Sequence, residues 1–129
     1  MSDQEKPKHY KDLLVWQKGM TLAKGVYVLT AKFPAEERFG LISQMRRAAV
    51  SVPSNIAEGQ ARQSTGEFLH FLSRSSGSLA ELETQLLLSV ELNICPALEV
   101  EALIGQIGEL QKMIVGLRRA LPSPLATRH

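Results

Sequence analysis

The chain has 129 residues, of which 44% are apolar and 22% are charged, a length and composition typical of one soluble globular domain. Its net charge of +2 is too small to indicate a nucleic-acid-binding protein from composition alone. The single cysteine, Cys95, excludes a disulfide or a zinc–cysteine cluster within one chain and fits a reducing compartment. The N-terminus is too polar for a secretory signal, and no apolar run reaches about 18 residues, the length of a membrane span. We therefore expect a cytoplasmic protein that does not enter a membrane.

Residues 1–9 are expected to be a polar N-terminal tail, and Asp12 is a candidate N-cap for the first helix. The helix carries apolar residues at alternating spacings of three and four: Leu13, Trp16, Met20, Ala23 and Tyr27. Leu14, Val26 and Leu29 widen this stripe. Pro34 ends the helix, because the residue before a proline leaves the α region.

The second helix is expected to start near Pro34 or Glu36 and to run to about Arg62, with two neighbouring stripes. One is apolar: Ile42, Met45, Ala49, Val52 and Ile56. The other is polar: Gln44, Arg47, Ser51, Asn55, Glu58 and Arg62. Pro53 removes one backbone hydrogen bond, so it either kinks one long helix or begins a new segment after a break. The stripes stay in phase across Pro53, which favours the kink.

The third helix has a capping box, because Ser64 is followed three residues later by Glu67 ahead of an apolar run. Its core seam contains Phe68, Leu72, Ser75, Leu79, Leu82 and Leu86, and a polar stripe of Arg74, Ser78, Glu81 and Gln85 lies beside it. The helix is expected to end around Asn93. A fourth helix is expected from about Pro96 to Ala120, before a C-terminal tail over 122–129.

Four amphipathic helices joined by short connections predict an all-α fold, an antiparallel up-down-up-down four-helix bundle over residues 10–121. Some apolar residues lie outside the main seams and indicate self-association, since they exceed what one small core needs. They are Leu14, Val26, Leu29, Ile104 and Met113.

Reflection of the second helix onto the third, about a turn near residue 63, places Arg46 and Arg47 level with Glu81. One hypothesis is an ion-pair network of these arginines with Glu81 or Glu83. The alternative is solvated surface charge, worth about 0 to 1 kcal/mol per pair.

Asn55 and Glu58 also admit two interpretations. They form a ligand or partner site near Pro53, or they are structural. In the structural interpretation Asn55 satisfies a backbone group freed by Pro53, and Glu58 pairs with Arg62 four residues later.

Catalytic, metal-binding and cofactor-binding residues are not expected. Glu67 and His70 have the Glu-x-x-His spacing of di-iron bundles, but such sites need a second pair. No Ser-His-Asp set can be assembled. Gly105 and Gly108 lie inside a helix, where we expect them to allow close packing rather than to bind phosphate.

Basic residues are candidates for a nucleic-acid surface: Arg38, Arg62, Arg74, Lys112, Arg118 and Arg119. The simplest interpretation is a solvated surface, and basic residues in the last helical turn also complement the helix dipole. In a symmetric ring, however, each basic patch would be multiplied and could hold a phosphate backbone.

Two segments, FPAEERFGLISQMRRAAVSVPSNIAEGQAR and SGSLAELETQL, resemble the 23S rRNA intervening-sequence (S23) protein family, and YKDLLVWQKGM resembles the family's first helix. The similarity covers roughly residues 10–95. It implies four antiparallel helices in a cyclic homopentamer, without an established catalytic activity. Relatives include accessory proteins of diversity-generating retroelements, which work beside a reverse transcriptase and bind nucleic acid. The family pattern is matched by Arg46, Arg47, Asn55, Glu58, Gly59, Ser78 and Glu81.

These observations favour a non-catalytic, self-associating binding protein whose partner is RNA or an RNA-handling protein. The alternative is a structural homo-oligomeric scaffold that binds no nucleic acid. Salt would distinguish the two, because phosphate contacts weaken steeply with ionic strength.

Overall fold

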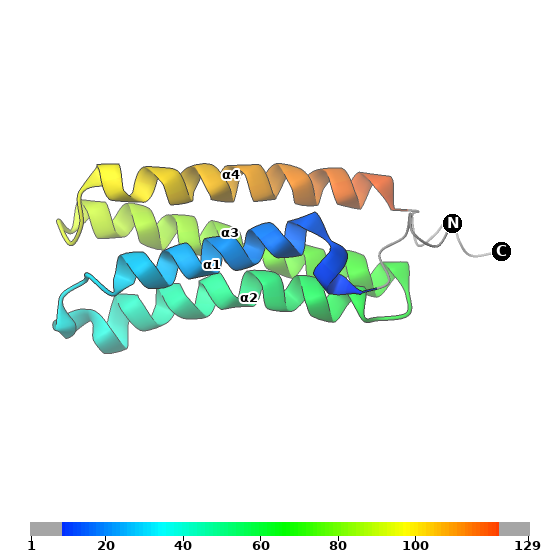
Figure 1. Cartoon of the computed structure of the whole chain (residues 1–129), viewed down its shortest axis with the longest axis horizontal. Helices are drawn as coiled ribbons and strands as arrows, with labels where there is room; N and C mark the ends of the chain where they lie inside the picture. Colours follow the sequence, from blue (N-terminus) through cyan, green and yellow to red (C-terminus); the bar gives the residue numbers. More distant parts are fainter. Residues whose placement is uncertain (1–8, 122–129) are drawn as a thin grey trace.

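The computed structural model describes residues 9–121, which form four long helices and no strand (Figure 1). The helices are α1 (Leu14–Thr30), α2 (Ser43–Gln60), α3 (Thr65–Glu91) and α4 (Ala97–Ala120). A short 3-10 turn, Tyr10–Asp12, precedes α1. The predicted all-α bundle is confirmed, whereas the expected tails, 1–9 and 122–129, lie outside the described residues except for His9. None of the helices within residues 9–121 is long and apolar enough to cross a membrane.

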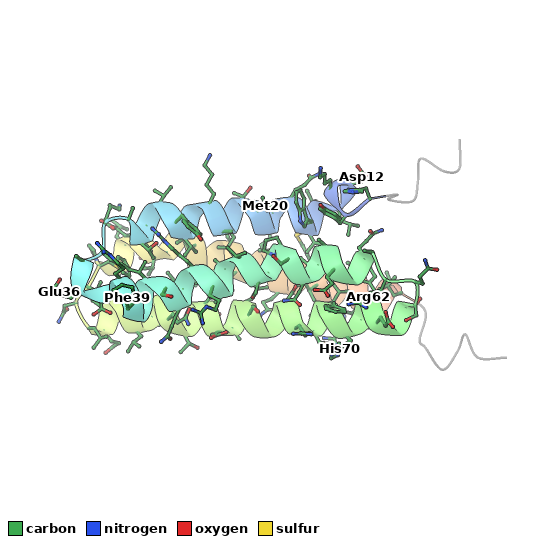
Figure 2. All side chains as sticks on the ribbon, turned by 90° about the horizontal axis from the view of Figure 1, so that it is seen from below. Asp12, Met20, Glu36, Phe39, Arg62 and His70 are labelled. Atoms are coloured by element: carbon green, nitrogen blue, oxygen red, sulfur yellow. The ribbon has the colours of Figure 1, made fainter. Side chains whose placement is uncertain are left out.

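The helices lie side by side along the long axis of the molecule (Figure 1). The start of α1, the α2–α3 connection and the end of α4 lie together, at what we call the Arg62 end. The α1–α2 and α3–α4 connections lie at the opposite end, which we call the Phe39 end. Figure 2 labels both residues. Residues far apart in the sequence therefore share each end.

The core consists of aliphatic side chains from all four helices. On α3, Leu72, Leu79, Leu82 and Leu86 are completely buried, as the seam predicts. On α4 the buried seam is Val100, Leu103, Ile107, Leu110 and Ile114. The capping box is also present, because the Ser64 hydroxyl accepts a hydrogen bond from Glu67 N at 3.1 Å. Sequence periodicity therefore assigns the correct face of α3.

The apolar stripe predicted for α1 is correct in part: Ala23 is buried and Leu13 and Trp16 pack against the core, but the other two residues of the stripe are exposed. Met20 is 47% exposed and Tyr27 is 44% exposed, whereas Leu22 and Val26 are fully buried. Gly19 lies on the buried face, where an added Cβ would be 3.5 Å from side-chain atoms of Val52 and Pro53. At that distance an added Cβ would make an ordinary van der Waals contact, so the packing of α1 on α2 does not require a glycine here.

The five residues that were proposed as marks of self-association differ in how far they are buried. Val26 and Leu29 belong to the core, so their assignment to an interface is wrong. Ile104 and Met113 are half-buried and pack against the core. Of the set, only Leu14 is predominantly exposed, at 57%.

The region before α2 is not the regular helix that was expected from Pro34 or Glu36. A 3-10 turn (Ala35–Glu37) leads into a π-helical turn (Arg38–Ile42), and the backbone of Gly40 has non-helical angles there (φ −107°, ψ −106°). The Glu37 carboxylate accepts a hydrogen bond from Leu41 N at 3.4 Å. This irregular turn leaves the side chain of Phe39 91% exposed.

Pro53 lies inside one uninterrupted helix, so the alternative of a break before it is wrong. Side-chain donors bond three carbonyls around it: Ser51 Oγ donates to Ala48 O (2.9 Å), Asn55 Nδ2 to Ser51 O (2.8 Å), and Ser75 Oγ to Val52 O (2.8 Å). The last of these bonds comes from α3. These bonds satisfy polar backbone groups in the region where the proline weakens the helix.

We predict that Gly59→Ala destabilises the bundle. An added Cβ would lie 2.6 Å from Phe71 Cβ and 3.1 Å from Phe68 Cδ1, so α2 and α3 would have to separate. The free energy of unfolding should fall by about 1 to 3 kcal/mol, as measured by urea denaturation.

Gly105→Ala is the matched control. A Cβ there meets nothing within 4 Å, and the same holds at Gly108, so the expected close packing of these glycines is wrong. Gly105→Ala should stabilise the protein by about 0.5 to 1 kcal/mol. Equal effects of the two substitutions would contradict the role of Gly59 in helix approach.

Candidate binding surfaces

The polar stripes of α2 and α3 meet as predicted. One groove of about 440 Å³ between the two helices is lined by residues of both stripes: Gln44, Arg47, Ser51 and Glu81. The hydroxyls of Ser51 and Ser78 share a short hydrogen bond across the same contact. Glu81 of α3 therefore lies near Arg47 of α2, in agreement with the reflection of one helix onto the other.

The predicted ion pairs of Arg46 or Arg47 with Glu81 or Glu83 are absent from the described part of the chain, where the ion pairs are Lys18–Glu109, Lys32–Glu99 and Arg62–Glu58. Arg46 turns toward α1 instead. Its Nε donates to Thr30 Oγ1 at 2.9 Å, and a terminal nitrogen donates to Tyr27 O at 3.3 Å. Its guanidinium also lies 4.4 Å from the centre of the Tyr27 ring.

The choice of partner by Arg46 has a simple cause. The last turn of α1, which contains Tyr27 and Thr30, attracts a cation because it lies at the negative end of the helix dipole. Arg47 is the next residue of α2 and therefore lies on a different face of the helix from Arg46. A terminal nitrogen of Arg47 donates to Ser43 Oγ at 3.4 Å. Arg46 therefore connects α2 to α1, and Arg47 remains exposed.

Asn55 and Glu58 make the local contacts of the structural interpretation. Glu58 pairs with Arg62 at 2.9 Å, as predicted. The Asn55 side chain donates a hydrogen bond to the carbonyl of Ser51. Pro53 has no N–H, so the carbonyl that it leaves without a helical partner is that of Ala49. The prediction that Asn55 satisfies the group freed by Pro53 is therefore wrong. Both side chains serve their own helix.

A second groove, of about 550 Å³, lies between α3 and α4 at the Arg62 end. Arg118, Arg119, His70 and Ser73 supply its polar groups, and Leu69, Val115 and Leu121 line its apolar part. Nearby, the guanidinium groups of Arg62 and Arg74 lie 5.0 and 5.3 Å from the centre of the Phe71 ring. Sequence reasoning selected the arginines, but it considered His70 only as a possible metal ligand and missed Ser73.

The candidate basic residues do not all share this surface. Five of them belong to the half of the bundle nearest the Arg62 end: Arg62, Arg74, Lys112, Arg118 and Arg119. Arg38 belongs to the π-helical turn at the opposite end. Arg38 is therefore separate from the predicted basic surface.

The described residues contain no group of three or more His, Cys, Asp and Glu side chains that could hold a metal ion. Cys95 is buried, and burial raises the pKa of its thiol, an effect that the charge of Glu99 increases and that of Lys32 opposes. At neutral pH the thiol is therefore protonated and unreactive.

We predict that Arg46→Ala lowers the free energy of unfolding by about 1 to 3 kcal/mol, because the substitution removes charged hydrogen bonds between α1 and α2. Arg47→Ala is the matched control and should change stability by less than about 0.5 kcal/mol, since Arg47 is exposed. Urea denaturation of both variants would test this. Equal losses would show that Arg46 does not connect the helices.

Comparisons with known proteins agree with this architecture. The model of the 23S rRNA-intervening sequence protein family matches residues 11–116. A similar solved structure is that of a protein with unknown function from the S23 ribosomal protein family of Bacteroides thetaiotaomicron, with a TM-score of 0.77 and 21% sequence identity. The alignment covers 83% of this chain and 100% of that chain. A comparison with curated proteins found no match.

At 21% identity the solved structure supports the fold alone. The family model spans most of the sequence, including both segments that carry the resemblance, 33–62 and 76–86. The chain belongs to the 23S rRNA-intervening sequence protein family.

Proposed function

We propose that this protein is a non-catalytic, self-associating bundle of antiparallel up-down-up-down helices that binds RNA in the cytoplasm. The observation that carries the proposal is the collection of cations from α3, α4 and the α2–α3 connection near the Arg62 end: Arg62, Arg74, Lys112, Arg118 and Arg119. Phosphate groups are the partners that such a surface favours, because counterions released from the nucleic acid drive the association.

The distribution of acidic residues supports this assignment. The halves of α3 and α4 toward the Phe39 end carry five acidic residues: Glu81, Glu83, Glu91, Glu99 and Glu101. Near the Arg62 end the described acidic residues are Asp12, Glu58, Glu67 and Glu109, fewer than the cations there. Two of them are already engaged in ion pairs, Glu58 with Arg62 and Glu109 with Lys18. The small net charge therefore conceals a separation of charge along the bundle, with an excess of cations at one end.

The helix dipole does not account for this surface. Arg118 and Arg119 lie in the last turn of α4, where any cation is stabilised. Arg74 and Lys112, however, lie inside their helices, beyond the reach of the terminal dipoles. In the described residues, none of these four side chains has a carboxylate within ion-pair distance. They remain available to an anionic partner.

We predict that RNA binding weakens by about 50-fold between 50 and 200 mM salt if the four cations without an ion pair contact phosphates. Fluorescence titration with a labelled single-stranded RNA at both salt concentrations would measure this. Salt-independent binding would contradict a phosphate-binding surface.

The double variant R118E/R119E should weaken binding by at least about tenfold at the lower salt concentration, since it reverses two phosphate contacts. Arg38→Glu is the matched control, because Arg38 is exposed at the opposite end. If Arg38→Glu were as harmful as the double variant, the effect would reflect net charge rather than this surface.

A homo-oligomeric scaffold without nucleic-acid binding is the second candidate function. It is favoured by large apolar side chains that are more than half exposed: Phe39 (91%), Leu98 (77%), Val28 (60%), Leu14 (57%) and Leu92 (56%). The family resemblance implies a homopentamer, whose mass would be five times the chain mass of 14.2 kDa. Light scattering measures this mass. A pentamer that ignores RNA would favour the scaffold, and a monomer would contradict self-association.

A further inference from the structure

We propose that the groove between α1 and α2 binds the Phe39 side chain of a second copy of this chain. The inference rests on the proposed self-association and names the two surfaces that would carry it. Both surfaces are present on every copy, so one contact would use the Phe39 turn of one molecule and the α1–α2 groove of another.

Among residues 9–121, Phe39 is the most exposed of the large apolar side chains, at 91%. Leu41, two residues later, is buried, so the turn is attached to the core while Phe39 points away from it. Figure 2 shows Phe39 beside Glu36 at the end of the bundle. An aromatic side chain presented in this way is typical of a contact residue, because its exposure to water is unfavourable.

The α1–α2 groove has a volume of about 450 Å³ and a predominantly apolar and aromatic lining, which includes Tyr10, Trp16, Met20, Tyr27, Val50 and Ala57. Tyr10 and Trp16 pack edge to face, with ring centroids 5.3 Å apart. The guanidinium of Arg46 makes a cation–π contact with the Tyr27 ring. The groove is thus preformed, and Met20, Tyr27 and Val50 are each more than 40% exposed.

The occupant of the groove cannot be the Phe39 of the same molecule. From Phe39 to Val50 the chain rises about 16 Å along the bundle, at about 1.5 Å per helical residue. Figure 2 likewise shows Phe39 at the end and Met20 well along α1. A contact between unlike surfaces of identical chains is heterologous, and it closes into a ring when the rotation permits.

Charge complementarity favours the same occupant. Lys24 lines the groove and has no carboxylate within ion-pair distance among residues 9–121. Arg46 and Arg47 line an adjoining groove that shares Tyr27, Val50 and Ser54 with the first. The turn of Phe39 carries Glu36 and Glu37 against the single cation Arg38. An acidic turn therefore faces a basic groove margin, which favours this pairing over a random apolar contact.

Two single variants and their mixture test the proposal. Phe39→Glu removes the inserted side chain, and Met20→Glu charges the groove. Both positions are exposed, and unchanged circular dichroism would verify their folds. Each variant should have the mass of one chain, 14.2 kDa, by light scattering. When the two variants are mixed at rising concentration, they should form a species of two chains. The Met20→Glu variant keeps an intact Phe39 turn, and the Phe39→Glu variant keeps an intact groove that can bind it. Leu98→Glu, at a position 77% exposed, is the matched control and should assemble like the unmodified protein.

Trp16, the single tryptophan, provides a readout inside the groove. Its emission should shift to the red in Phe39→Glu, because the groove loses its occupant, and should stay unchanged in Leu98→Glu. An unmodified protein with the mass of one chain would overturn self-association itself. An unmodified assembly that persists in Phe39→Glu, or a mixture of the two variants that stays monomeric, would overturn this inference alone.

Discussion

The close approach of α2 and α3 determines the positions of the other parts of the bundle. Gly59 leaves room for Phe71, and the small side chains of Ser51, Ser75 and Ser78 form hydrogen bonds across the contact. One of these bonds reaches a carbonyl next to Pro53, in the stretch where the helix is weakest. The proline is consequently tolerated inside a continuous helix, and its ring packs in the interior near Gly19 of α1. A single contact region therefore positions three of the four helices.

This packing also separates structural polar residues from available ones. Arg46, Asn55 and Glu58 match the family pattern, yet each is engaged with a neighbouring helix or with its own. The cations of the α3–α4 groove have no such internal partner among the described residues. A residue that matches the family pattern can thus maintain the bundle, and the surface best suited to phosphate contains residues outside that pattern, such as Arg118 and Arg119.

The two proposed surfaces use different helix pairs. RNA would occupy the α3–α4 groove, whereas a neighbouring copy would occupy the α1–α2 groove through Phe39. Self-association therefore would not cover the basic residues, and an assembly would present several copies of them at once. Such repetition strengthens the binding of a long polyanion without any new contact in the single chain, because each further site binds at a high effective concentration.

The sequence by itself determined the four helices, the limits of α3 and α4, the Ser64 cap and the Glu58–Arg62 pair. These features depend on contacts within a few residues, which spacing along the chain reports directly. Only the tertiary structure decided which apolar residues of α1 are buried, because apolar residues cover more of this helix than the core contacts. It also decided the partner of Arg46, sixteen residues away, and the exposure of Phe39. Those outcomes depend on which segments meet in space, and periodicity carries no information about that.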